Sequence, residues 1–169
     1  ATDADGDDVT FTVSGSELSI TSAGVLTFAT APDYETQTSY SATVTVSDGT
    51  NTATQDITVN VTDANDPPTF TSNATFSAAE NQTAIGTVTA SDPEGDTLSF
   101  TISGSDITIV SSSGLLEFAS APDFETQTSY SVTVTVSDGT NTVTQDITVN
   151  VTNVNDVAPE FTSNATFSA

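Results

Sequence analysis

Apolar residues alternate with serine and threonine along much of the chain. Every second residue is apolar from Tyr40 to Val46 and again from Ile57 to Val61. Alternation with a period of two predicts β-strands that turn one face to a core and the other to water. The sequence SDGTNT, residues 47–52, separates these two runs and supplies the Gly and Asn of a hairpin turn.

Shorter runs of the same kind predict the remaining strands. They lie at Val9–Val13, Leu18–Thr21, Val25–Phe28, Thr69–Ser77 and Ala84–Ala90. No segment has the period of a helix. Seven short strands separated by turn residues predict an all-β fold of Ig-like, antiparallel Greek-key β-sandwiches with two sheets each.

The aromatic residues are mostly in phase with the buried face. Phe11, Phe28, Phe100 and Phe118 are therefore expected in a core. Tyr40 and Tyr130 each begin a strand and have two interpretations, a corner position in the core or part of a sugar-stacking surface. Their phase favours the core.

An internal repeat dominates the organisation of the chain. The sequence from Ala31 to Asp66 recurs almost unchanged from Ala121 to Asp156, a period of about 90 residues, which is typical of an Ig-like domain rather than of a solenoid. We expect residues 1–66 to form a repeat without its first two strands and residues 67–157 a complete repeat. Residues 158–169 are expected to form the first strand of a third repeat.

The charge of the chain has one sign. It carries 23 Asp and Glu residues with no Lys, Arg or His, so its formal net charge is -23. Salt bridges cannot offset the repulsion between side chains, which leaves wide spacing of the acids or bound cations. Hard divalent cations bind Asp, Glu, Asn and carbonyl oxygens, and Ca²⁺ is therefore the expected cofactor.

The missing residue types exclude several functions. Without His, Cys and Lys the chain has no usual neutral-pH base, thiol nucleophile or Schiff-base amine, and we predict that this segment is not an enzyme. Nothing basic is available to bind nucleic acid. No apolar run is long enough for membrane insertion.

Acidic and amide residues recur at equivalent places in both halves. Asp3 and Asp5 correspond to Asp92 and Glu94 in the second half. Asp33 and Glu35 correspond to Asp123 and Glu125, and Asp48 corresponds to Asp138. The segment that follows each long hairpin contributes Asp63, Asn65 and Asp66, and then Asn153, Asn155 and Asp156. Glu80 in AAEN has no counterpart in the first half.

This pattern resembles cadherin repeats. That family has a Glu near the end of its first strand, an Asp-x-Glu before its sixth strand and an Asp-x-Asn-Asp linker, followed in the next repeat by an Asp-x-Asp and a further Asp. The nearly identical, Thr-rich copies are most similar to the cadherin-like arrays of large bacterial surface adhesins and filaments. The resemblance covers essentially the whole chain and implies extracellular, cell-surface domains with calcium between consecutive repeats.

The resemblance implies one junction that lies fully inside the chain and two junctions of which the chain holds one half each. The first junction would use Asp33, Glu35, Asp63, Asn65, Asp66, Asp92, Glu94 and Asp138. The second would use Glu80, Asp123, Glu125, Asn153, Asn155 and Asp156, with its other half beyond the C-terminus. Asp3, Asp5 and Asp48 would be the upper half of a junction that begins before Ala1, although Asp48 by itself reads as an ordinary turn residue.

Two departures from the family pattern affect these sets. Asn153 replaces an Asp at the start of the second linker, and Glu94 replaces the second Asp of its pair. The second junction therefore has one negative charge fewer than the family pattern would give it.

Three functions are consistent with the sequence. The favoured one is a calcium-rigidified extracellular stalk or filament segment of a repetitive adhesin, whose partners are neighbouring repeats of the same array. One alternative is a calcium-dependent module that binds surface polysaccharide or protein. The other is a filament subunit that joins other copies of itself head to tail, by adding PEFTSNATFSA to the incomplete first repeat.

Overall fold

The computed structural model describes residues 1–162, and its regular elements in that range are all β-strands. The chain divides into two units, unit 1 (Ala1–Asn65) and unit 2 (Asp66–Ala169). Within the described residues, no helix is long and apolar enough to cross a membrane. Residues 158–162 form no strand, and the rest of the strand expected in 158–169 lies outside the described residues.

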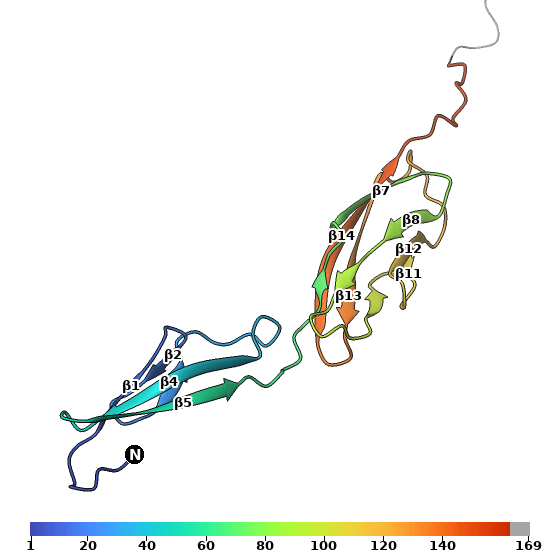
Figure 1. Cartoon of the computed structure of the whole chain (residues 1–169). Helices are drawn as coiled ribbons and strands as arrows, with labels where there is room; N and C mark the ends of the chain where they lie inside the picture. The colour runs from blue at the N-terminus through green and yellow to red at the C-terminus, as the bar shows by residue number, and fades with distance from the viewer. Residues whose placement is uncertain (163–169) are drawn as a thin grey trace, which may run out of the picture. The chain divides into compact units, whose positions relative to one another are not determined.

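Unit 2 is a sandwich of two main sheets (Figure 1). One sheet has the order β10 (Ser99–Ile102), β13 (Ser129–Ser137), β14 (Thr142–Thr152) and β7 (Thr75–Ala79). The other has the order β11 (Ile107–Ile109), β12 (Leu115–Phe118) and β8 (Ala84–Thr87). A short antiparallel pair, β6 (Thr69–Phe70) and β9 (Ala90–Ser91), completes the unit. The expected all-β sandwich is confirmed.

The first strand of unit 2 changes partners along its length. Thr69–Ser77, expected as one strand, is divided into β6, which pairs with β9, and β7, which runs parallel to β14. Between them Ser72 Oγ accepts a hydrogen bond from the N–H of Thr89 at 3.1 Å. The parallel pair differs from the antiparallel arrangement expected from the sequence, and it covers an edge of β14 that would otherwise be open.

The core of unit 2 lies between its sheets. Val88, Leu116, Val134, Val136 and Val149 are fully buried, with relative exposures of 0 %. Phe100 and Phe118 are also buried. The half-buried ring of Tyr130 packs edge-on against Phe118, with a centroid distance of 5.1 Å. The core interpretation of these three aromatic residues is confirmed.

Unit 1 has the same hairpin with fewer strands around it. One sheet has the order β1 (Thr10–Val13), β4 (Ser39–Ser47) and β5 (Thr52–Asn60), and a second pairs β2 (Leu18–Ile20) with β3 (Leu26–Phe28). Tyr40 packs edge-on against Phe28 at 5.1 Å, repeating the contact in unit 2. Phe11 and Phe28 are only half-buried, and among the described residues of unit 1 Leu18 is the one buried large hydrophobic side chain.

Candidate metal site

Glu80 follows β7 directly and is the most unusual acidic residue of unit 2. Its relative exposure is 3 %, and it is the one buried charged side chain among the described residues. Oε1 accepts a hydrogen bond from the N–H of Val154 at 2.6 Å, and Oε2 accepts one from the N–H of Phe124 at 2.8 Å. The carboxylate thus connects the end of β7 to the segment after β14 and to the loop before β13.

The loop before β13 is an Asp-x-Glu turn. Asp123 Oδ2 accepts a hydrogen bond from the hydroxyl of Thr126 at 2.9 Å, and Oδ1 accepts one from the N–H of Glu125 at 2.9 Å. The hydrogen bond from the Thr126 hydroxyl is the largest cause of a lowered pKa for Asp123. Desolvation opposes it, and the backbone N–H groups of Glu125 and Thr126 lower the pKa further. Asp123 is therefore held in its charged form, with its side chain fixed by the turn.

Three carboxylates meet at this place. Glu80, Asp123 and Glu125 each present an oxygen, and these oxygens lie within 4.8 Å of one another. Like charges at such separations repel, and the chain has no Lys, Arg or His to compensate them. The donor set consists of hard oxygens, and this chemistry fits Ca²⁺. Exposed Asp123 and Glu125 leave the cluster open to solvent on one side.

The segment after β14 also reaches the cluster. The side-chain amide of Asn153 donates a hydrogen bond to Glu125 Oε1 at 3.0 Å, so the residue that replaces an Asp contributes a donor here. Asp156 Oδ2 accepts a hydrogen bond from the Asn81 side-chain amide at 2.6 Å. Of the predicted ligands in this segment, Asn153 is hydrogen-bonded to the cluster itself and Asp156 to Asn81, the residue after Glu80. Among the described residues, no hydrogen bond links Asn155 to the cluster.

Asn81 is a residue that the motif pattern did not single out. It has a φ of 63°, in the left-handed region where Asn is tolerated better than most residues. Its N–H donates to the carbonyl oxygen of Pro122 at 3.0 Å, which joins the turn after Glu80 to the Asp123 loop. The available signal was its position directly after Glu80 in AAEN.

A second acidic loop of unit 2 contains Asp92 and Glu94. Asp92 Oδ1 accepts hydrogen bonds from the N–H groups of Glu94 and Asp96, both at 3.1 Å, and Glu94 Oε2 accepts one from the N–H of Asp66 at 3.1 Å. The other oxygen of each carboxylate, Asp92 Oδ2 and Glu94 Oε1, is buried without a hydrogen-bond partner. Buried, unsatisfied carboxylate oxygens are costly in an apolar site and suit a cation.

Asp138 belongs to the β13–β14 turn. Its Oδ1 accepts a hydrogen bond from the N–H of Thr140 at 2.6 Å, so its first role is to hold this turn. Asp48 does the same in unit 1, where the N–H groups of Asn51 and then Thr50 lower its pKa. The interpretation of Asp48 as a turn residue agrees with these contacts.

Unit 1 repeats the local geometry of the acidic loops. The Thr36 hydroxyl donates to Asp33 Oδ2 at 2.9 Å and is the main cause of a lowered pKa for Asp33. Glu35 and Asp63 place carboxylate oxygens within 4.8 Å of each other. Asp3 Oδ1 accepts a hydrogen bond from the N–H of Asp5 at 2.8 Å, as Asp92 does from Glu94.

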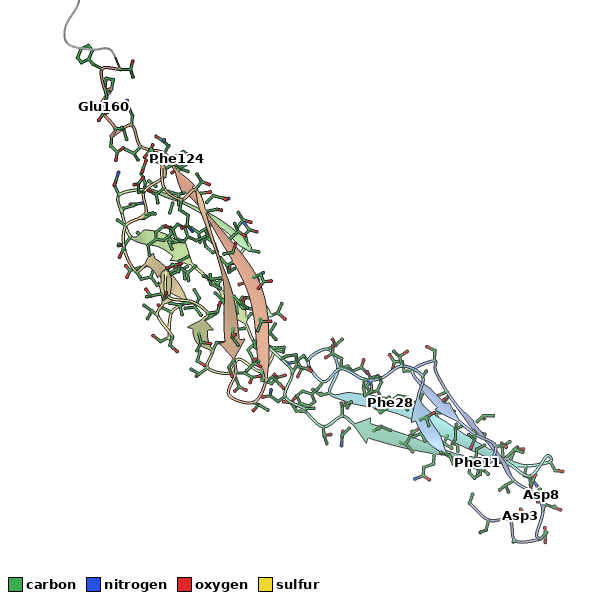
Figure 2. All side chains as sticks on the ribbon, turned by 180° about the vertical axis from the view of Figure 1, so that it is seen from behind. Asp3, Asp8, Phe11, Phe28, Phe124 and Glu160 are labelled. Carbon is green, nitrogen blue, oxygen red and sulfur yellow. The ribbon has the colours of Figure 1, made fainter. Side chains whose placement is uncertain are left out.

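The acidic cluster of unit 2 lies where the chain leaves the sandwich. Figure 2 shows Phe124, the residue between Asp123 and Glu125, at the end of unit 2 from which the chain continues to Glu160. In unit 1 the Asp3 loop precedes β1 (Figure 2). Acidic groups are thus concentrated in the loops rather than in the strands.

Sequence comparisons identify a domain family. The family profile described as "Bacterial Ig domain" matches residues 65–152, slightly more than half of the chain. Chitinase A of Pseudoalteromonas piscicida is 38 % identical over 156 residues, covering 90 % of this chain but 19 % of that protein. The human cadherin EGF LAG seven-pass G-type receptor 1 is 33 % identical over 153 residues, covering 82 % of this chain and 5 % of the receptor. The chain thus spans a small part of these relatives.

Structural comparisons identify the fold. The human protocadherin-24 EC1-2 structure has a TM-score of 0.67 at 20 % identity, covering 90 % of this chain and 85 % of that one. The mouse cadherin-23 EC22-24 structure has a TM-score of 0.62 at 22 % identity, covering 96 % of this chain and 60 % of that one. The cadherin-like fold expected from the motifs is confirmed.

Proposed function

The chain belongs to the bacterial Ig domain family, and on that premise we propose that it is a segment of an extracellular stalk or filament whose repeats are made rigid by calcium. Its cadherin-like fold is that of extracellular adhesion domains. Calcium would bind at the acidic loops where consecutive repeats join. Neighbouring repeats of the same array are the partners of each domain in this proposal.

One observation carries the proposal. Glu80 is buried next to Asp123 and Glu125 in a chain that has no basic side chain. A buried carboxylate is stable in its charged form only with compensating charge or hydrogen bonds, and its two backbone donors leave the repulsion from the neighbouring acids uncompensated. Calcium, when bound, would supply the missing positive charge.

The ligand sets follow from the contacts within each unit. Glu80, Asp123 and Glu125 would hold the ion at the end of unit 2, with the Asn153–Asp156 segment beside them. Asp92 and Glu94, each with a buried oxygen free of hydrogen bonds, would serve the start of unit 2 together with Asp66. Glu35 and Asp63 would contribute from unit 1.

Rigidity would follow from where these ligands lie in the chain. The segments after β5 and after β14 form no regular strand, so without an ion their acidic groups repel and the segments can flex. Pro67 and Pro68 restrict the backbone just before β6. Extracellular calcium modules have dissociation constants of about 10⁻⁴ to 10⁻³ M, a range suited to occupancy outside the cell.

Small-angle X-ray scattering tests this function. We expect the maximum dimension of the chain to be larger and its distribution narrower in calcium than in chelator. Glu94→Gln should weaken the calcium response, whereas Glu117→Gln, the same charge change on an exposed strand position, should preserve it. An identical distribution in calcium and in chelator would contradict the proposal.

The recognition alternative has less support from the described residues. Their strongly exposed large hydrophobic side chains are mostly aliphatic, and Phe161 is the one aromatic residue among them. A sugar-stacking platform generally needs exposed aromatic faces, and Tyr40 and Tyr130 instead pack against Phe28 and Phe118. The observations therefore favour a structural role.

A further inference from the structure

Each unit has a cavity beside the tyrosine near the start of its long hairpin. In unit 2 this cavity has a volume of about 360 Å³ and lies between the β10–β11 connection, the segment after β12 and the start of β13. Unit 1 has a cavity of about 460 Å³ at the equivalent place, beside the start of β4. We call these cavities the tyrosine pockets. Each lies within one unit, so the same feature occurs twice independently.

The walls of both tyrosine pockets combine an aromatic residue with carboxylates. Each wall contains one tyrosine and two acidic residues, which are Tyr130, Asp106 and Asp123 in unit 2 and Tyr40, Glu17 and Asp33 in unit 1. The chain has no basic side chain that could pair with these acids. A carboxylate beside an aromatic ring attracts an alkylammonium group, through charge and through the cation–π interaction.

The pocket acid is retained where the two repeats differ in sequence. Glu17 of unit 1 corresponds to Asp106 of unit 2, so the residue type changes but the charge does not. At another exposed position of the same hairpin, Thr27 of β3 corresponds to Glu117 of β12, and there the charge differs. Retention of the acid is therefore not a simple result of the similarity between the repeats.

Backbone hydrogen bonds hold the walls of the pockets together. In unit 2 the N–H of Ala119 donates to the carbonyl oxygen of Asp106 at 2.8 Å, which joins two walls. In unit 1 the N–H of Ala29 donates to the carbonyl oxygen of Glu17 at 2.9 Å. The ring of Tyr130 is held against the core of unit 2. The pockets are thus formed before a ligand binds, which reduces the cost of binding.

Asp106 is the acid of the unit 2 pocket that is most available to a ligand. Both oxygens of Asp123 accept hydrogen bonds within their own turn, and Asp123 also belongs to the acidic cluster with Glu80. Asp106 is exposed, and no hydrogen bond from another described residue reaches its carboxylate. An ammonium group can therefore pair with Asp106 without displacing an internal contact.

We propose that the tyrosine pocket of each unit binds a lysine side chain presented by a partner protein. The ammonium group pairs with Asp106 in unit 2 or with Glu17 in unit 1, and the alkyl part lies along the tyrosine. The formal net charge of -23 favours a partner with a basic surface. Each contact is open to solvent and weak, so stable binding requires several lysines. This function goes beyond the structural role and does not depend on calcium.

An NMR titration of the complete chain tests the proposal, at physiological ionic strength and with excess calcium. The probe is an acetylated and amidated peptide with one lysine between two glycines. We expect saturable shifts of the Asp106 and Ala119 amides and of the Tyr130 ring, whereas the Nε-acetyllysine peptide, which lacks the charge, should give none. Asp106→Asn should weaken binding in unit 2 about three- to fivefold. Glu117→Gln, an equal charge change outside the pocket, should leave it unaltered.

Three outcomes would overturn the proposal. Shifts spread evenly over all acidic loops, or equal affinities of Asp106→Asn and Glu117→Gln, would show non-specific attraction to a negative chain. Saturable shifts with spermidine but not with the lysine peptide would identify a free polyamine as the ligand instead. Glu17→Gln should weaken binding in unit 1 alone, which repeats the test in the second pocket. Because Asp106 is not a predicted calcium ligand, failure here is distinguishable from failure of the calcium proposal.

Discussion

Glu80 Oε1 accepts a hydrogen bond from the backbone N–H of Val154 at 2.6 Å, a contact that joins residues 74 positions apart. The same carboxylate binds the N–H of Phe124 through its other oxygen. Glu80 therefore holds together the three segments that form the acidic cluster. This position makes it both a structural residue of unit 2 and the proposed centre of its calcium site.

Replacing Glu80 by glutamine should separate these two roles. Glu80→Gln retains an acceptor for one backbone N–H but removes a negative charge from the cluster, so calcium affinity should fall at least about tenfold. Titration of the chain with calcium measures the change, and Glu117→Gln is the matched control. Equal affinities for the two variants would contradict a role for Glu80 in calcium binding.

Protonation of Asp123 should depend on Thr126. The hydrogen bonds to Asp123 lower its pKa in the folded state, so their stabilising effect is present above the unfolded pKa and is lost as pH falls through the folded pKa. Thr126→Val removes the largest cause and should raise the pKa of Asp123 towards its usual value, while the backbone donors keep part of the shift.

The ¹³C signal of the Asp123 carboxyl group, followed during a pH titration, measures this pKa. Thr144→Val on the exposed face of β14 is the control and should leave it unchanged. A Thr126→Val chain that titrates like the control would show that the hydroxyl has no such effect.

A valine pair should report the difference between the two cores. Val134→Ala removes two methylene-sized groups from a fully buried site and should destabilise unit 2 by about 2 kcal/mol. The equivalent Val44→Ala should cost unit 1 less than about 1 kcal/mol, because its side chain is already half-exposed. Hydrogen exchange resolved by residue measures the loss of stability in each unit. Equal losses would contradict the open core of unit 1.

Gly114 should tolerate no side chain. It has a φ of +70°, and a Cβ there would lie 2.1 Å from the carbonyl oxygen of Val88. Gly114→Ala should destabilise unit 2 by more than about 2 kcal/mol through strain and displacement of this segment. Gly104, with a φ of +84° and open space around it, is the control and should cost about 1 kcal/mol. Similar losses at both positions would contradict the close approach.

The sequence predicted the strands and the faces of the sheets well. The alternation from Tyr40 to Val46 placed β4, and the phase of Phe100 and Phe118 placed both in the core. Alternation specifies which face a residue occupies but not which strand lies beside it, and so the switch of partners at Ser72 was not predictable. The parallel pairing of β7 with β14 depends on contacts between distant residues.

The acidic cluster of unit 2 was also predictable from the sequence only in part. The spacing of Asp123 and Glu125 and the position of Glu80 identified the three carboxylates that the fold brings together. The near-complete burial of Glu80 and the contact of Asn81 with Asp156 arise from the fold of the whole unit. A left-handed residue such as Asn81 has only a weak signal in a single sequence.

The proposed calcium site is tested most directly by a calcium titration followed through the backbone amides of Phe124 and Val154. Both N–H groups donate to Glu80, so an ion bound to that carboxylate must change their NMR signals. We predict saturable shifts of both amides with a dissociation constant of about 10⁻⁴ to 10⁻³ M, reversed by chelator and lost in Glu80→Gln. Amide signals that stay unchanged up to about 10 mM calcium, well above this range, would contradict the account.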